Sequence, residues 1–326
     1  MKVRNFKKAT AIVLALSLSV LGLSACQNQN TPDSKESDSS MNADVSENTD
    51  ASSNDETSEA SKENTEATTE NKSEETSRPI VVIGPMESEY AILESTLENP
   101  KETLIGPYKF VRGTISGQDV VTLRSYVGMT NAAIVTTLAI QEFNPSAVIF
   151  QGTSGGHNPE YHQGDIVLGE NIINIGAYNS PHRDAGQGIE FKDWEMPGIQ
   201  MKSATPGEFE DVEVLHSDAK LLEIAKSVAY DHGTVYTGTI SSGDIWNKEI
   251  DRINYLHEEY GSDCEEMEGH AVAQVCYQFD VPVLGIRILS NSELHPEEEF
   301  DHIFGEYCQK FSIDVIKAIA EANQDK

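Results

Sequence analysis

The chain has 326 residues, 54 of them acidic and 23 basic, and a formal net charge of −31 at pH 7. A surface this acidic repels phosphate backbones, so we expect no nucleic-acid partner. The length is sufficient for one large α/β domain with additional flanking segments.

The first 26 residues have the pattern of an export signal. Four basic residues precede an apolar run over 9–23, which is short for a membrane span. The segment Leu23-Ser24-Ala25-Cys26 resembles a bacterial lipobox, and that resemblance implies cleavage before Cys26 and lipidation of Cys26. We therefore expect residues 1–26 to be a lipoprotein signal peptide and the protein to be lipid-anchored on the extracytoplasmic face of the cell membrane. A plain signal peptide and an uncleaved N-terminal anchor are the alternatives.

Residues 27–78 form a Ser/Thr/Glu-rich segment with almost no apolar side chains. The segment holds 14 acids and four bases. Such a composition buries too little apolar surface to offset its conformational entropy, so we predict a disordered acidic linker. Its expected role is to hold the domain at 79–326 away from the membrane.

Residues 79–326 contain β-branched runs that alternate with amphipathic stretches. Strands are predicted over 79–84, 108–116, 119–126, 147–150, 164–169, 234–240 and 283–289. Helices are predicted after 85–89, over 132–143, 215–230, 250–260 and 300–322, and from about 268 to Asp280. Residues 177–210 are expected to be an irregular loop, long enough to suggest a functional role. This alternation predicts an α/β fold with a mostly parallel, twisted central sheet between two layers of helices.

Five segments of polar or glycine-rich sequence follow strands or precede helices in this domain. They are Gly84–Glu89, Gly128–Asn131, Gly152–Gly156, Ser242–Trp246 and Ser290–Asn291. Glycine at a strand end lets backbone N–H groups approach a ligand closely. Because ligands bind at the carboxyl ends of strands in open α/β sheets, five such ends predict one polar pocket.

These motifs, in this order, resemble the purine nucleoside phosphorylase and nucleosidase superfamily. Within that superfamily the chain is most similar to the methylthioadenosine/S-adenosylhomocysteine nucleosidases. The likeness covers about the whole of 79–326. It is carried by Ile83–Glu89, Gly152–Gly156 with Gly164-Asp165, Ser242–Asp244, Glu266-Met267-Glu268 and Arg287-x-x-Ser290. The resemblance implies a nucleoside phosphorylase-like three-layer fold.

The resemblance also implies roles for individual residues at the sugar end of a nucleoside. Glu89 would hold and deprotonate the attacking water. Glu268, preceded by Glu266, would accept hydrogen bonds from the ribose hydroxyls, with Met267 packed under the sugar. Breaking an N-glycosidic bond creates positive charge on the ribose, which nearby carboxylates stabilise. The alternative for Glu89 and Glu268 is an acid favoured by a helix N-terminus.

For the base end, the resemblance places Ser154 and Gly155 beneath the nucleoside and Trp246 against the purine face. A purely structural, core role is the alternative for Trp246. Ser290 and Arg287 belong to the same set of motifs. Arg287 lies in an apolar strand and needs a charged partner if it is buried, for which Glu89 is a candidate.

The sequence also indicates whether the nucleophile is water or phosphate. Phosphorylases of this superfamily carry arginines around the phosphate, in the first glycine loop and before the central glycine motif. The corresponding segments here are 85–89 and 149–152, and neither contains arginine. Glu87 and Glu89 would repel a phosphate dianion, so we favour hydrolysis.

Asn291 stands where the nucleosidases carry an aspartate that protonates the purine at N7. An asparagine cannot supply that proton, but it can donate to an oxygen at the purine 6-position. We therefore expect a purine nucleosidase acting on methylthioadenosine or S-adenosylhomocysteine-type nucleosides, with three alternatives: a 6-oxopurine nucleosidase, a phosphorylase, or a non-catalytic nucleoside-binding protein. No metal-ligand spacing is visible among the histidines and cysteines, and we expect no cofactor. The resemblance implies at least a homodimer.

Overall fold

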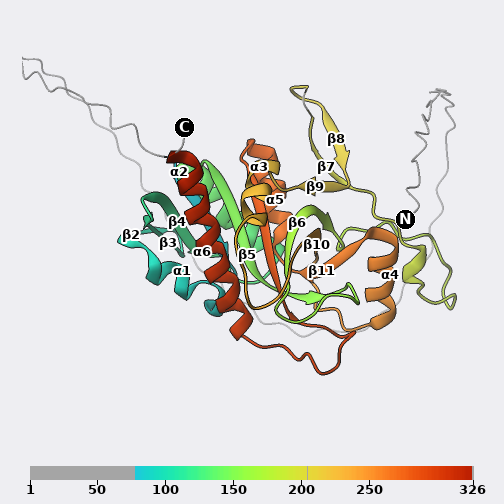
Figure 1. The fold of residues 1–326 in the computed structure, drawn as a ribbon. Helices are drawn as coiled ribbons and strands as arrows, with labels where there is room; N and C mark the ends of the chain where they lie inside the picture. The colour runs from blue at the N-terminus through green and yellow to red at the C-terminus, as the bar shows by residue number, and fades with distance from the viewer. Residues whose placement is uncertain (1–77, 204, 325–326) are drawn as a thin grey trace, which may run out of the picture. The chain divides into compact units, whose positions relative to one another are not determined.

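The computed structural model describes residues 78–203 and 205–324 (Figure 1). The predicted signal peptide, the lipidation of Cys26 and nearly all of the predicted linker lie outside these residues. Within the described part of the chain, no helix combines the length and the apolar character needed to cross a membrane.

The described residues form twelve strands and six α-helices, with two 3₁₀ turns. The strands are β1 (Ile80–Gly84), β2 (Glu98–Ile105), β3 (Tyr108–Ile115), β4 (Gln118–Arg124), β5 (Ala147–Gly156), β6 (Ile166–Asn174), β7 (Ile199–Lys202), β8 (Phe209–Val212), β9 (Val214–His216), β10 (Val235–Ser242), β11 (Ser262–Glu266) and β12 (Val283–Asn291). The helices are α1 (Ala91–Thr96), α2 (Met129–Phe143), α3 (Ala219–Lys226), α4 (Ile250–Tyr260), α5 (Gly269–Phe279) and α6 (Ile303–Gln324), and the 3₁₀ turns are η1 (Glu87–Glu89) and η2 (Phe191–Asp193).

Ten of the strands form one mixed sheet. Its main path runs β11-β10-β6-β12-β5-β1-β4-β3-β2, and β9 pairs with β6. Pairings of β1 with β4 and β5, of β5 with β12 and of β10 with β6 and β11 are parallel. Since β11 also pairs with β5, antiparallel, the strands β5, β12, β6, β10 and β11 close into a ring. The predicted α/β class with flanking helices is confirmed, although the sheet is more mixed than expected.

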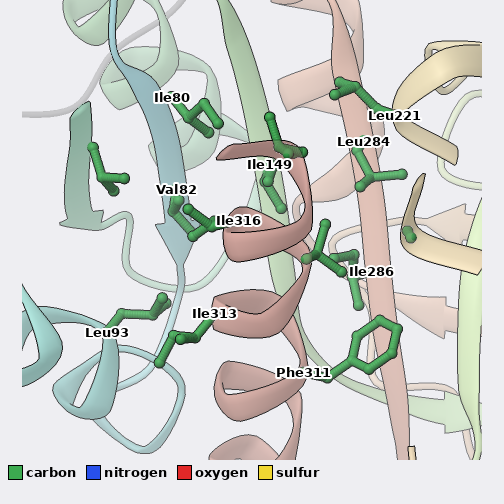
Figure 2. Packing of buried hydrophobic residues seen from close by; sticks show 14 of the residues in the cluster. Ile80, Val82, Leu93, Ile149, Leu221, Leu284, Ile286, Phe311, Ile313 and Ile316 are labelled. Carbon is green, nitrogen blue, oxygen red and sulfur yellow. The ribbon is translucent and has the colours of Figure 1, made fainter. Parts of the chain in front are cut away.

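One face of the sheet packs against α6, α1 and α3. Alternate residues of β1, Ile80 and Val82, point to this face and are at most 1% exposed. Figure 2 shows Val82 beside Ile316 of α6, with Ile80 and Ile313 in the same cluster. Full burial of each such side chain contributes roughly 1.5–3 kcal/mol, so this seam fixes α6 against the sheet.

The opposite face packs against α2 and α5. Val81 and Ile83, the intervening residues of β1, contribute to this second cluster. Val135 of α2 and Val272 of α5 are fully buried in it. Because successive strand residues point to opposite faces, one β-branched run supplies both layers of the core.

Four local predictions need correction. β2 was not predicted, because an edge strand with mainly exposed side chains lacks alternating apolar residues. β11 was not predicted either, since its sequence Ser-Asp-Cys-Glu-Glu is polar although all five residues are buried. The segment 177–210 is not wholly irregular, because β7 pairs with β8 in a separate hairpin. The helix predicted over 215–230 begins later, as α3, where the Asp218 side chain accepts from the N–H groups of Lys220 and Leu221.

Candidate active site

A cavity of about 390 Å³ opens where β1, β5, β11 and β12 end and where the segment after β10 begins. Four of the five predicted polar segments line it, and the fifth reaches it through the backbone N–H of Gly128. Of the ten residues predicted to bind or act on a nucleoside, nine line the cavity: Glu89, Ser154, Gly155, Trp246, Glu266, Met267, Glu268, Ser290 and Asn291. The tenth, Arg287, lies behind the acidic wall.

Glu89 stands on one wall of the cavity at the end of η1. One carboxylate oxygen accepts hydrogen bonds from the backbone N–H and the hydroxyl of Thr153, at 2.6 and 2.7 Å. The other accepts from the backbone N–H of Met86 at 2.8 Å. Three donors hold the side chain in one rotamer, and hydrogen bonds to a carboxylate are stronger than those between neutral groups.

The backbone of β5 at Gly152 passes close to the Glu89 carboxylate. Gly152 has φ +155°, and a Cβ on it would lie 2.6 Å from Arg287 Nη1 and 2.9 Å from Glu89 Oε1. Glycine is therefore required where β5 passes between these charged groups. Gln309 of α6 supports the η1 loop, because its side-chain oxygen accepts from the N–H of Ile92 and its amide group donates to Ser88 O at 2.7 Å.

Glu266 and Glu268 form the opposite, acidic wall. The Arg287 guanidinium, 1% exposed, forms ion pairs with both carboxylates, 3.3 Å from Glu268. The suggestion that Glu89 would pair with Arg287 is wrong. Strand β12 places Arg287 beside Glu266, the last residue of β11, and Glu268, two residues later. This juxtaposition depends on the ring of strands.

The structure separates the roles of these two acids. Glu266 accepts from the N–H groups of Glu268 and Gly269 and from the Ser242 hydroxyl, so it satisfies the first turn of α5. Glu268 is the N-cap residue but makes no side-chain capping bond, and instead accepts from Gly128 N–H at 2.9 Å. The helix-terminus alternative for Glu268 is thereby disfavoured. Burial raises the pKa of Glu268, opposed by the Arg287 charge and reinforced by Glu266.

The base end of the cavity is more open. Trp246 is 60% exposed and its ring meets Phe300 edge-on, with centroids 5.8 Å apart. A core role for Trp246 is therefore excluded, while a flat ligand could lie against its indole. Asn291, at the end of β12, accepts through Oδ1 from the Ser290 hydroxyl at 3.0 Å. Its Nδ2 is then left to donate to a ligand.

Several residues that line this cavity were not predicted from the sequence. Thr153 lies inside a recognised glycine-rich motif, so the contact with Glu89 could have been sought there. Glu265, Asn247 and His157 form a polar recess in which Glu265 accepts from Asn247 N–H at 3.0 Å. Phe300 was predicted as the first residue of the C-terminal helix, but it precedes α6, which begins at Ile303, and no local signal marked it as a cavity residue.

Charge in this recess is controlled by burial. Burial raises the pKa of Glu265, and the Asn247 N–H and the Arg252 guanidinium, 3.2 Å away, oppose this shift. Burial lowers the pKa of His157 to about 3, with Arg252 and His257 adding to the effect. His157 is therefore neutral at physiological pH.

Among residues 78–203 and 205–324, no group of three or more His, Cys, Asp or Glu side chains is arranged to hold a metal ion. Cys264, Cys276 and Cys308 are free thiols, and all three are buried. Burial raises the pKa of each thiol, which makes these residues packing groups and poor nucleophiles.

Comparison with known proteins places these features in context. Residues 79–321 match the family described as the phosphorylase superfamily. A 5'-methylthioadenosine/S-adenosylhomocysteine nucleosidase of Geobacillus kaustophilus is 34% identical over 214 residues, 64% of this chain and 83% of that protein. The protein of the same name from Geobacillus thermodenitrificans is 30% identical over 249 residues, 75% of this chain and 97% of that protein.

Solved structures have the same fold. The Neisseria meningitidis 5'-methylthioadenosine/S-adenosylhomocysteine nucleosidase, in complex with methylthio-immucillin-A, has a TM-score of 0.60 and 26% identity, covering 74% of this chain and 99% of that one. A futalosine hydrolase of Helicobacter pylori has a TM-score of 0.57 and 22% identity, covering 76% of this chain and 98% of that one. The second likeness concerns the fold alone.

Proposed function

This chain belongs to the phosphorylase superfamily, and we propose that it is a purine nucleosidase that cleaves the N-glycosidic bond with water activated by Glu89. One observation carries the proposal. A cavity of about 390 Å³ has Glu89, held by three donors, on one wall and the paired carboxylates of Glu266 and Glu268 on the other.

Residues on the two walls of the cavity can share the work of cleaving the N-glycosidic bond. As the bond to the base breaks, positive charge develops on the ribose, and the carboxylates of Glu89 and Glu268 stabilise it. Glu268 accepts from a ribose hydroxyl, and Met267 packs under the sugar. Glu89 removes a proton from the attacking water as its oxygen bonds to the ribose carbon, a contribution of roughly 10²–10⁴-fold for a well-placed general base. The purine leaves with the electron pair of the broken bond and takes up a proton from solvent. Arg287 keeps the two acids of the other wall together without itself reaching the cavity.

The charge of the cavity wall favours water over phosphate. Among the described residues that line the cavity, none is lysine or arginine. Arg124, the basic residue nearest the first loop, donates to Pro85 O and lies 3.4 Å from Glu87. A phosphate dianion would meet carboxylates without a basic partner, so phosphorolysis is disfavoured.

Two base classes are compatible with this activity. The names of the curated relatives favour methylthioadenosine or S-adenosylhomocysteine-type substrates. The second candidate, a 6-oxopurine nucleoside, is favoured by Asn291. Its Nδ2 presents donors, which suit acceptor atoms at the purine 6-position and N7, while its Oδ1 accepts from the Ser290 hydroxyl.

The protein is proposed to act as a homodimer at the membrane surface. Val127, Ile245 and Trp246 are exposed apolar residues at the cavity, suited to burial by a second subunit. The lipobox-like segment supports lipid attachment at Cys26 on the extracytoplasmic face. Cys26→Ser should release the protein from membrane fractions, and retention there would reject lipid attachment. Sedimentation velocity should give twice the monomer mass, and a monomer would reject the homodimer.

The activity is tested by incubating the full chain with methylthioadenosine, S-adenosylhomocysteine, adenosine, inosine and guanosine, with and without phosphate. We expect free base and free sugar without phosphate. Release of a sugar 1-phosphate that depends on phosphate would replace hydrolysis by phosphorolysis. Tight nucleoside binding without base release would favour a non-catalytic binding protein.

A further inference from the structure

We propose that Glu265 reads the edge of the purine opposite Asn291 and that the cavity selects a 2-amino-6-oxopurine, the guanine class. The inference rests on the proposed nucleosidase function and specifies its base. The resemblance assigned no role to Glu265, which is 8% exposed and lines the same cavity as Asn291.

Strand register places the two residues on either side of one glycine. Gly155 of β5 pairs with Glu265 of β11 on one side and with Asn291 of β12 on the other. Two strand spacings separate Glu265 from Asn291 by about 10 Å. A Cβ on Gly155 would lie 3.6 Å from Asn291 Nδ2, so the Asn291 amide stands beside the glycine, where no side chain covers the cavity floor. A base lying over Gly155 therefore meets one residue at each edge.

The two edges differ in hydrogen-bonding character. Asn291 presents the two N–H donors of Nδ2, while its Oδ1 accepts from the Ser290 hydroxyl. Glu265 presents acceptors, with Oε1 holding Asn247 N–H at 3.0 Å and Oε2 holding Arg252 at 3.2 Å. A carboxylate has about four lone-pair directions, so two protein donors leave capacity for two from a ligand. The Asn247 N–H, a potential donor at this edge, is consumed by Glu265.

Guanine matches this arrangement at both edges. Its O6 and N7 accept, facing Asn291, and its 1-NH and 2-amino groups donate, facing Glu265. Adenine fits this arrangement less well, because its unprotonated N1 faces the Glu265 carboxylate and because it has no 2-amino group. Hypoxanthine lacks the 2-amino group, and xanthine carries an oxygen in its place. The expected order of binding is guanine, hypoxanthine, then adenine and xanthine.

Binding of the four free bases to the full chain, measured by calorimetry, tests the inference without requiring catalysis. We expect guanine to bind roughly 10- to 100-fold more tightly than adenine or xanthine, as for hydrogen bonds to a charged group. Equal or tighter binding of adenine or xanthine overturns the inference, as does absence of guanine binding. Guanine preference without cleavage of any nucleoside retains it and rejects the proposed function. Cleavage of adenine nucleosides without guanine binding does the reverse.

Glu265→Gln separates base reading from structural support. It should lower the guanine-to-adenine affinity ratio roughly 10-fold or more, because one acceptor becomes a donor that suits adenine N1. The matched control is Glu293→Gln, at the cavity edge, where the carboxylate pairs with Lys248 at 3.3 Å and is not proposed to contact the base. That control should leave the ratio unchanged. A Glu265→Gln variant that melts like the parent and keeps the parental ratio overturns the inference, and so does an equal change in both variants.

Discussion

The sugar end and the base end of the cavity are built differently. At the sugar end, Glu89, Glu266 and Glu268 are buried and each is held by several protein donors or by Arg287. At the base end, Trp246 is 60% exposed and Asn291 keeps an unoccupied amide group. The comparison indicates rigid preorganisation where charge develops, and one fixed acceptor, Glu265, beside more exposed contacts where the base is chosen.

The largest effect on activity is expected from Glu89→Gln, which removes the general base and changes only the sugar end of the cavity. The amide cannot take a proton from water, so kcat should fall roughly 10²–10⁴-fold. Steady-state assays of base release measure this. Binding of the free base should remain at the parental level, because Glu89 stands at the sugar end, whereas Asn291 and Glu265 stand at the base end. Parental turnover would place the catalytic base elsewhere.

Arg287→Met tests how far the sugar end depends on its buried ion pairs. Removing the guanidinium leaves Glu266 and Glu268 together without a counter-charge, at a cost of about 3–5 kcal/mol in the free energy of unfolding. Urea denaturation measures the change. Lys317→Met, which removes the exposed pair with Asp314, is the control and should cost at most about 1 kcal/mol. Similar losses in the two variants would contradict the comparison.

His157→Gln probes the recess at the base end through pH. The pKa of His157 is lowered to about 3 in the folded chain. Below about pH 6.5 the unfolded chain therefore binds a proton at this residue that the folded chain does not bind. The parent should therefore lose stability as pH falls from about 6.5 towards 3, about 2 kcal/mol of it by pH 5. The variant should lack this component in denaturation curves between pH 5 and 7, whereas a variant of the exposed His182 should retain it. Parallel curves for parent and His157→Gln would refute the assignment.

The smallest effect is expected from Asn291→Asp, which changes only base preference. A carboxyl group can protonate N7 and accept from a 6-amino group, so adenosine cleavage relative to inosine cleavage should rise about tenfold. Ratios of kcat/KM for the two nucleosides measure it. An unchanged or lower ratio would remove the argument that Asn291 favours 6-oxopurines.

Much of the fold and part of the site follow from local patterns. The run Ile80–Gly84 is β-branched and ends in glycine, and it forms β1. The polar segments at 84–89, 152–156 and 290–291 could be assigned to one cavity, because strand ends gather at one edge of a sheet. β2 and β11 were not predicted, because their side chains are mainly polar and strand prediction depends on hydrophobic alternation.

What the sequence alone determined is the α/β class, the two-faced core and the segments that carry the acids of the cavity. These follow from the spacing of apolar side chains and from glycine at strand ends, which are local properties. Only the tertiary structure decided that Arg287 faces Glu266 and Glu268, and that Glu265 and Asn291 flank Gly155. Those relations arise from pairing β11 and β12 with β5, strands more than a hundred residues away in the chain, and no periodicity in the sequence encodes which strands become neighbours.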